Sequence, residues 1–502
     1  MNTAQARLQP ASLGTLPAAV ERPHVRRDGL ACGIVHLGLG AFMRGHLAAF
    51  NDDALIADDA SGSPAWGISG VSLRHADTRD ALAPQQGLYT LALRDTDSAG
   101  SLRQHLRVIG SLREMLVAPE DPAAVLLRIA ARETRIVSLT VTEKGYSHDL
   151  TSGTLDLAYP DIAHDLTHHD APRSAIGYIA HGLALRRARG LPGVTLLSLD
   201  NLPANGRLLH GLLQAFVQAQ GDAALAEWIE RCCNWPCSMV DRIVPRTTDA
   251  DREQVAAALG ARDAWPVVAE PFIDWVLEDR FAAGRPDWPG VRYVATAADV
   301  AAWERLKLRM VNGAHSALAY LGVVAGWVTV DAAMAQPALR RFVDAMLQGE
   351  VEPTLTGLVV PPGYRERLLQ RFANPALAHR CAQIAMDGSQ KIPQRLLDSV
   401  RDRLARGAPI TRLALALAGW LHFLRGRDEA GRSYAIDDPL APLLQALIRQ
   451  ADALADPRER AECLTRCAPV FGDLAGEPRL IDALAPALES LRQRGVAATL
   501  GA

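Results

Sequence analysis

The amino-acid sequence predicts an α/β N-terminal domain followed by a mainly α-helical C-terminal domain. In the first half, short apolar runs end in glycine or polar residues, which is typical of buried strands in a parallel sheet. In the second half, apolar residues recur almost throughout at helical spacing. Residues 284–290, Gly-Arg-Pro-Asp-Trp-Pro-Gly, have the composition of a loop between these halves. We therefore expect an extended lead-in at 1–30, an α/β domain at 31–290 and a helical domain at 291–502.

Composition excludes several classes of protein. Hydrophobic residues make up 49% and charged residues 22% of the chain, as in ordinary globular proteins. The formal net charge of −3 provides no electrostatic attraction to nucleic acid or to an anionic membrane. The N-terminus lacks the apolar segment of a secretory signal, and the most apolar runs suit buried helices better than membrane spans. Seven cysteines, an odd number, indicate reduced thiols in a cytoplasmic protein, and no zinc-ligand set is expected.

A strand, a glycine turn and a helix are predicted in succession near the N-terminus. The apolar run Gly33-Ile-Val-His-Leu37 leads into Gly38-Leu-Gly-Ala-Phe-Met-Arg-Gly-His46 and a helix beyond. Such an arrangement binds the pyrophosphate of a dinucleotide at a helix N-terminus. Met43 stands where the third glycine of this fingerprint would be, so a simple turn is the alternative. The predicted cofactor site comprises Ile34, Gly38, Leu39, Gly40, Ala41, Phe42 and Arg44.

The second predicted strand, residues 66–73, should end beside the ribose of the cofactor. An acidic residue at that point favours NAD, whereas an arginine accommodates the 2′-phosphate of NADP. The chain has Arg74 first and Asp77 three residues later. We therefore predict NAD and leave NADP open.

Polar residues also follow two further predicted strands, and one interrupts a third candidate segment. Residues 135–141 lead into Thr142-Glu-Lys-Gly-Tyr146, residues 194–199 lead into Asp200-Asn201, and Asp241 interrupts the apolar run 237–245. Open α/β sheets place their sites beyond the carboxyl ends of their strands. A helix cap is the simpler interpretation of any single residue of this kind, Asn201 included.

Lys307 is one of only three lysines among the 53 lysine and arginine residues of the chain. A desolvated lysine can give up its proton, whereas arginine cannot, so a retained lysine is a candidate for proton chemistry. In a regular α-helix, His315 lies about 80° and Asn312 about 140° around from Lys307. An ammonium, an amide and an imidazole on one face suit a site that polarises a carbonyl group. A solvated polar stripe is the alternative.

The C-terminal half is predicted to be almost entirely helical. A loop at residues 387–395, which holds Lys391 and Arg395, is expected between two of the helices, and simple solvent exposure of both cations is the alternative. The predicted helices are 301–326, 330–350, 364–386, 396–406, 411–425, 438–455, 457–470 and 478–498.

Taken together, these segments resemble the polyol-specific long-chain dehydrogenases, the mannitol dehydrogenase family. The matching motifs are Gly38-x-Gly-x-Phe-x-Arg-x-His46, residues 140–146, Asp200-Asn201 with Asn205-Gly206, residues 239–245, and Lys307-x4-Asn312-x2-His315. Within the family, the chain is most similar to fructuronate reductase (D-mannonate oxidoreductase). Supporting stretches are residues 174–178, 270–272, 374–375, 379–380, 385–397 and 418–420.

The resemblance implies a metal-free hydride transfer between a nicotinamide and a secondary alcohol carbon. It implies that Lys307 is the general acid/base, that Asn201 and Asn312 bind the oxyanion, and that His315 orients the substrate. Glu143 would lie on a proton or water path, and Asp241 in the substrate pocket.

The expected substrate is a sugar acid or a polyol. For the carboxylate of fructuronate, Lys391 and Arg395 are the candidate cations. An uncharged polyol, as in a mannitol or arabinitol 2-dehydrogenase, is the alternative, and a catalytically silent dinucleotide sensor is a more distant one. We expect a monomer or a small homo-oligomer without a nucleic-acid or membrane partner.

Overall fold

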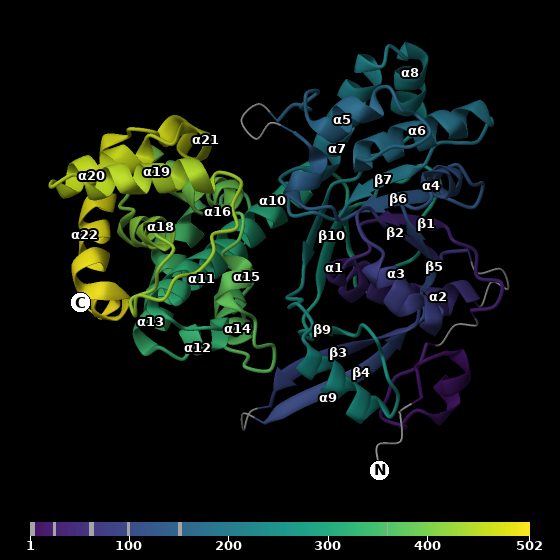
Figure 1. Cartoon of the computed structure of the whole chain (residues 1–502), viewed down its shortest axis with the longest axis horizontal. Coiled ribbons are helices and arrows are strands. Elements are labelled where there is room, and N and C mark those ends of the chain that lie inside the picture. The colour runs from purple at the N-terminus through teal and green to yellow at the C-terminus, as the bar shows by residue number, and fades with distance from the viewer. Residues whose placement is uncertain are drawn as a thin grey trace. The chain divides into compact units, whose positions relative to one another are not determined.

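A computed structural model describes residues 6–23, 27–59, 65–97, 101–148, 153–358 and 360–501. The chain forms two compact units, Met1–Ala301 and Ala302–Ala502. Figure 1 shows strands throughout the first unit and helices throughout the second. The α/β fold followed by a mainly helical fold is therefore confirmed, whereas the limits of the three predicted segments remain a prediction.

The first unit is built around a five-stranded parallel sheet with the order β5-β2-β1-β6-β7. This is the Rossmann order, with the change of direction between β1 and β6. In register, Leu37 of β1 lies beside Val71 of β2 and Leu139 of β6. The strands are β1 (Ile34–Leu37), β2 (Ile68–Ser72), β5 (Leu112–Val117), β6 (Ile136–Leu139) and β7 (Thr195–Ser198).

Four strands of this sheet lie inside the runs that we predicted as strands. All residues of these strands are buried, so each strand is a continuous, largely apolar run that can be recognised in the sequence. The fifth, β5, was not predicted. It lies at the edge of the sheet, and its four central residues are half-buried and include Arg113 and Glu114, which weakens its apolar signal.

Helices cover both faces of this sheet. Figure 1 shows α5, α6, α7 and α8 grouped beside β6 and β7. Two of these helices begin with an aspartate or serine whose side chain accepts a backbone N–H, Ser174 for α6 and Asp222 for α8. The helices are α1 (Ala41–Gly45), α2 (Leu47–Asp59), α3 (Asp77–Leu82), α4 (Pro122–Ile129), α5 (Pro160–Asp165), α6 (Ala175–Ala188), α7 (Asn205–Ala219), α8 (Ala223–Cys232) and α9 (Asp249–Leu259).

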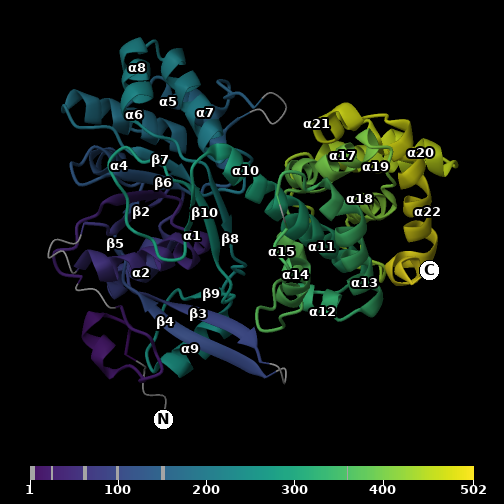
Figure 2. The same ribbon diagram turned by 180° about the vertical axis from the view of Figure 1, so that it is seen from behind.

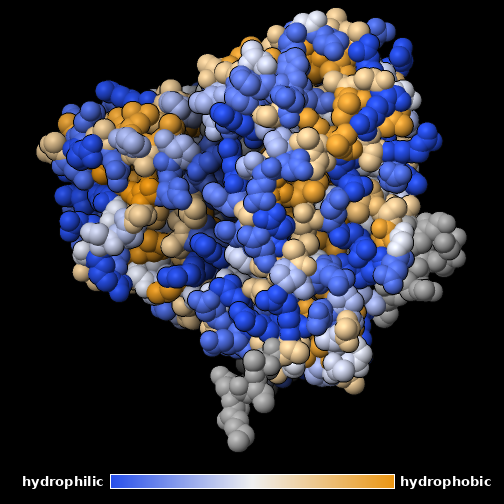
Figure 3. All heavy atoms as spheres, turned by 45° about the vertical axis from the view of Figure 1, so that its right-hand side comes forward, coloured by the Kyte–Doolittle hydropathy of each residue, from blue (hydrophilic) through white to orange (hydrophobic). Residues whose placement is uncertain are grey.

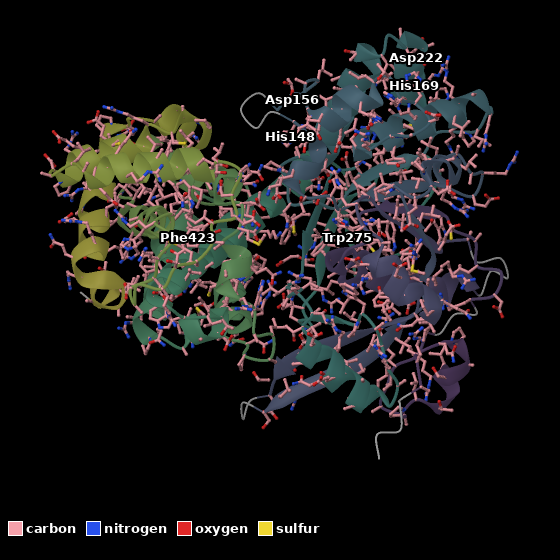
Figure 4. All side chains as sticks on the ribbon, in the orientation of Figure 1. His148, Asp156, His169, Asp222, Trp275 and Phe423 are labelled. Carbon is pink, nitrogen blue, oxygen red and sulfur yellow. The ribbon has the colours of Figure 1, made fainter. Side chains whose placement is uncertain are left out.

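Two smaller sheets complete the first unit, and Figure 2 shows them from behind. One has the order β11-β10-β8 and the other the order β4-β3-β9. Trp275 of β10 is completely buried in the core of the unit and is labelled in Figure 4. The strands are β3 (Tyr89–Thr96), β4 (Leu102–Ile109), β8 (Ser238–Asp241), β9 (Val267–Ala269), β10 (Asp274–Glu278) and β11 (Arg292–Val294).

We had predicted an extended N-terminal segment, but part of it is helical. Residues Pro10–Thr15 form a 3-10 helix, η1, and Glu21 forms a β-bridge with Arg107. Leu8, Leu16 and Val20 are buried, so scattered apolar residues without a regular period anchor the segment to the first unit.

The second unit consists of helices packed around α11 (Gly313–Ala325), most of whose residues are buried. Gly419 of α18 allows that helix to approach α11, because a Cβ there would lie 2.8 Å from a methyl group of Leu321. Phe423 of α18 is buried in the same core (Figure 4). The helices are α10 (Ala297–Leu306), which begins in the first unit, α11, α12 (Val330–Met334), α13 (Pro337–Met346), α14 (Tyr364–Phe372), α15 (Cys381–Ile384), α16 (Gly388–Ile392), α17 (Asp398–Ala405), α18 (Thr411–Phe423), α19 (Ala441–Asp452), α20 (Pro457–Thr465), α21 (Ala468–Phe471) and α22 (Pro478–Leu500).

The predicted loop at 387–395 is wrong, because this segment is helical. It forms α16 and the π-helix η7 (Pro393–Leu397). Asp438, far along the sequence, accepts hydrogen bonds from the backbone N–H and the hydroxyl of Ser389 and so fixes the start of α16. The predicted helix 364–386 is also interrupted, since Pro375 disfavours helical geometry at Asn374.

The described residues contain no helix that is both long and apolar enough to cross a membrane. On the face shown in Figure 3, hydrophilic residues are interspersed with hydrophobic ones. All seven cysteines are free thiols. Within the described ranges, no group of three or more potential metal ligands comes together.

Candidate functional site

The glycine turn after β1 has the geometry that its sequence predicts. Gly38 has a φ of +101°, and a Cβ there would lie 2.0 Å from the carbonyl oxygen of Thr140, so only glycine allows the turn after β1 to approach the end of β6 this closely. Gly40 precedes the first residue of α1 and is exposed, and the nearest atom to a Cβ there is 3.8 Å away. This turn therefore leaves room for a ligand at the carboxyl edge of the sheet.

The other predicted cofactor residues differ in accessibility. Ala41 and Phe42 are half-buried in α1, whereas Leu39 is buried against Gly70 of β2. Ile34 lies at the start of β1 inside the core. Arg44 is buried, donates a hydrogen bond to the carbonyl oxygen of Trp265 and stacks over Tyr89.

Beyond β2 lie Arg74 and Asp77, the two residues that we predicted to decide between NAD and NADP. Arg74 donates a 2.8 Å hydrogen bond to Asp161 of α5, and the Arg74 side chain is 60% exposed. Asp77 is exposed in the first turn of α3, five residues after the strand ends. The charge of Arg74 is thus balanced within the protein.

At the ends of β6 and β7, two predicted site residues lie on adjacent turns. Glu143 begins the short helix η3 (Glu143–Tyr146), and exposed Asn201 follows β7. Asp200, which we did not predict as a site residue, lies between them and accepts hydrogen bonds from Val141, Thr142 and Tyr146. Its position just beyond a buried strand was the available signal.

Asp241 ends β8 and is buried opposite Asp274 of β10. Asp241 therefore belongs to a different sheet from β6 and β7, the strands that precede Glu143 and Asn201.

In the second unit, Lys307 lies in a π-helix rather than in the predicted α-helix. The π-helix η4 (Lys307–Asn312) separates α10 from α11. Because its hydrogen bonds join residues five apart, Asn312 follows Lys307 by about one turn and lies on the same side, closer than α-helical geometry had predicted. Such π-turns often occur at functional sites.

The side chains of this segment are buried, which excludes the solvated polar stripe. Lys307 is 5% exposed and Asn312 is 7% exposed. Asn312 Nδ2 and His315 Nε2 are both buried and have no hydrogen-bond partner among the described residues. Because a buried polar atom without a partner is costly, these two nitrogen atoms mark a place where a polar ligand fits.

His315 is held between two rings. It stacks on Phe372 with ring centroids 4.9 Å apart, and it meets His379 edge to face at 5.1 Å. Burial lowers the pKa of His315 well below its ordinary value, and the nearby His379, Arg395, Arg371 and Lys391 add to this effect. The imidazole is therefore neutral at physiological pH.

Both predicted cations of the 387–395 segment lie near this histidine. Arg395 is 8% exposed and donates a 3.3 Å hydrogen bond to Ser316, the residue after His315. Lys391 donates a 2.6 Å hydrogen bond to the carbonyl oxygen of Met386. Gly313 permits this arrangement, because a Cβ there would lie 2.7 Å from the carbonyl oxygen of Arg395.

Both halves of the chain match known protein families. Residues 32–290 match the mannitol dehydrogenase Rossmann domain, and residues 299–492 match the mannitol dehydrogenase C-terminal domain. The chain belongs to the mannitol dehydrogenase family. It is therefore an oxidoreductase, and the predicted resemblance is confirmed.

Members of this family with different names are equally similar to the chain. The D-mannonate oxidoreductase of Escherichia coli (strain K12) is 41% identical over 488 residues, which cover 95% of this chain and 96% of that protein. The mannitol 2-dehydrogenase of Phaeosphaeria nodorum is 40% identical over 485 residues, covering 95% and 82%. Among solved structures, the Pseudomonas fluorescens mannitol 2-dehydrogenase ternary complex with NAD and D-mannitol has a TM-score of 0.90, 36% identity and 99% coverage of both chains.

Proposed function

We propose that this protein is an NAD-dependent oxidoreductase that interconverts D-fructuronate and D-mannonate. Membership of the mannitol dehydrogenase family supports the reaction class. The similarity to D-mannonate oxidoreductase and to mannitol 2-dehydrogenase is nearly equal, so the choice of a sugar acid depends on the side chains around His315.

The carboxyl edge of the parallel sheet is the proposed cofactor site. The positive φ of Gly38 and the open space at Gly40 fit a pyrophosphate, as in other Rossmann domains. When bound, the nicotinamide supplies or accepts the hydride. Arg74 is the residue that would contact the 2′-phosphate of NADP. Because its charge is already paired with Asp161, we expect NAD to be preferred over NADP.

The polar side chains around Lys307 are the proposed catalytic group. Lys307 donates a proton to the substrate oxygen in reduction and removes one in oxidation, and the buried amide of Asn312 stabilises the negative charge on that oxygen. Neutral His315 orients the substrate through Nε2. Asn201, Glu143 and Asp241 keep the roles that the family resemblance implies.

The observation that carries the choice of substrate is the set of cations near His315. Arg395, Arg371 and Lys391 each lower the pKa of that imidazole, so three cationic side chains lie near a ligand that binds at His315. A carboxylate in such a place is stabilised, whereas an uncharged polyol gains nothing from these charges.

A substrate panel tests this proposal. We expect reduction of fructuronate with NADH to exceed reduction of fructose by at least tenfold in kcat/KM, with tagaturonate and xylulose as further comparisons and NADPH as the alternative cofactor. Equal rates for fructose and fructuronate would instead support the second candidate, a mannitol 2-dehydrogenase, which is the name of other relatives of similar identity.

The proposed reaction requires no metal, because an ammonium and amide groups polarise the carbonyl. After exhaustive chelation we expect an unchanged rate and no stoichiometric metal in the protein. Activity that returns only on addition of Zn²⁺ would contradict this mechanism.

A further inference from the structure

Two turns at the carboxyl edge of the parallel sheet are joined through one carboxylate, that of the half-buried Asp200. β6 and β7 are parallel neighbours, with Leu139 beside Ser198, so both chains leave the sheet at the same edge. The turn after β6 presents Glu143, and the turn after β7 presents Asn201. Asp200 lies between these turns.

The carboxylate of Asp200 accepts hydrogen bonds from two successive backbone N–H groups. Val141 donates to Oδ2 and Thr142 donates to Oδ1, both at 3.0 Å. The hydroxyl of Tyr146 donates to Oδ2 at 2.9 Å and also contacts the hydroxyl of Ser198 at 2.5 Å. Both carboxylate oxygens of Asp200 therefore accept hydrogen bonds. These bonds connect the residues at both ends of η3 to the chain that follows β7.

The turn that Asp200 holds is strained. Thr142 has φ +62° and ψ 170°, a conformation that β-branched residues rarely adopt and that persists only where surrounding contacts enforce it. Gly145 is equally constrained, since a Cβ there would lie 2.6 Å from the Cβ of Val141. Glu143 directly follows the strained residue, so its position depends on the bonds to Asp200. Figure 4 labels His148, two residues beyond this turn.

We propose that Asp200 is a positioning residue of the active site, whose carboxylate sets the turn of Glu143 against the turn of Asn201. This inference rests on the proposed function for its catalytic consequence, and on the hydrogen bonds alone for its structural part. Asn205 supports the same edge, because its amide donates to the carbonyl oxygens of Asp200 and Ser238.

The titration of Asp200 agrees with a role beyond stability. Burial and, to a smaller extent, the charge of Glu143 together raise its pKa to about 6, against the opposing effect of the three hydrogen bonds. Glu143 and Tyr146, both from η3, are the titratable groups that face it in the described part of the chain. The pKa of Asp200 is higher in the folded protein than in the unfolded chain, so protonation of Asp200 stabilises the fold. This contribution is complete below the ordinary pKa of an aspartate and is lost as the pH rises through about 6. The ionised carboxylate is therefore not retained for stability.

The test compares Asp200→Asn with Asp263→Asn in the full-length protein. Asp263 is a matched control, because it is buried, its pKa is also raised by burial, and it accepts hydrogen bonds from two backbone N–H groups and from Gln85. It lies outside the parallel sheet, next to β9.

We expect the kcat/KM of the wild-type protein to rise with pH through about 6. Asp200→Asn should lower kcat/KM at pH 8 at least tenfold and abolish this inflection. Asp263→Asn should change kcat/KM less than twofold and retain the inflection. Tyr146→Phe, which leaves the carboxylate in place, should move the inflection to higher pH, because the hydroxyl lowers the pKa of Asp200. An Asp200→Asn variant that keeps both its rate and its inflection would overturn the proposal.

Amide hydrogen exchange of residues 140–147 provides a readout that needs no substrate. We expect exchange in this segment to become at least tenfold faster in Asp200→Asn and to be unchanged in Asp263→Asn. If no substrate of the panel reacts but exchange accelerates, the proposed function fails while Asp200 still holds the turn. If the substrates react but exchange is unaltered, the role of Asp200 is wrong.

Discussion

At the scale of single residues, the candidate site residues of the second unit could be proposed from local sequence alone, whereas those of the first unit could not. Lys307 was identified by the rarity of lysine and by its apolar neighbours, and its burial fits that prediction. Asn201, by contrast, was assigned only through the family resemblance. Asp200 was missed because its hydrogen bonds join residues that are about 60 positions apart, a relation that no local pattern contains.

Replacing Lys307 by arginine tests its proposed role more sharply than replacing it by alanine. Arginine keeps the positive charge but cannot release a proton at neutral pH, so we expect kcat to fall by more than tenfold. Cofactor binding, followed by NADH fluorescence, and the unfolding transition should stay close to wild type. A residual rate above roughly one tenth, which corresponds to about 1.4 kcal/mol of activation free energy, would show that Lys307 is not the acid/base.

Lys391 is predicted to contribute to selectivity for the carboxylate. A charge-assisted hydrogen bond to the substrate is worth roughly 1.5–3 kcal/mol, so Lys391→Met should remove most of the preference for fructuronate over fructose. Lys391→Arg, which keeps the charge, should retain more of that preference. The measurement is the ratio of kcat/KM for the two sugars. A ratio unchanged in Lys391→Met would assign the selectivity to Arg395 or exclude a carboxylate at this position.

At the scale of elements, apolar patterns predicted what is buried and missed what tertiary contacts impose. The four strands buried on both faces were visible in the sequence, whereas the edge strand β5 was not. The π-helices η4 and η7 were also missed, since an apolar pattern does not distinguish a π-turn from the α-helix around it. Their positions matter because they carry Lys307, Asn312 and Arg395.

Gly313, the first residue of α11 and the one directly after η4, is predicted to control the contact of this segment with η7. In Gly313→Ala, the new Cβ would lie 2.7 Å from the carbonyl oxygen of Arg395, and the backbone of one helix must move. We expect a loss of about 1–3 kcal/mol in the free energy of unfolding, typical of overpacking, together with a lower kcat/KM. Urea unfolding and steady-state kinetics measure the two effects.

Gly211 provides the control for this substitution. It lies within α7, and no atom lies within 4 Å of a Cβ added there. Gly211→Ala should therefore be neutral or stabilise the protein by about 0.5–1 kcal/mol, the usual gain within a helix. If Gly313→Ala behaves like Gly211→Ala, the close approach of Gly313 to η7 is not a constraint.

At the scale of the whole molecule, two histidines and Asp200 change the pH dependence of stability in opposite directions. Burial lowers the pKa of His36 to about 3 and that of His379 to about 4, so each imidazole is neutral in the folded state at pH values where it is protonated in the unfolded chain. Their contribution is present above about pH 6.5 and is lost as the pH falls toward these values. Asp200, with a raised pKa, acts in the opposite direction below about pH 6.

Two variants of the first unit separate these contributions. Each group changes the slope of unfolding free energy against pH by up to about 1.4 kcal/mol per pH unit. Between pH 6 and 4, His36→Asn should make stability fall less steeply on acidification, because the unfolded chain no longer takes up that proton. Asp200→Asn should make it fall more steeply, because the folded state loses a group that binds a proton in this range. Calorimetric unfolding at several pH values gives both slopes. Two variants with the wild-type slope would mean that neither group titrates differently in the folded and unfolded states.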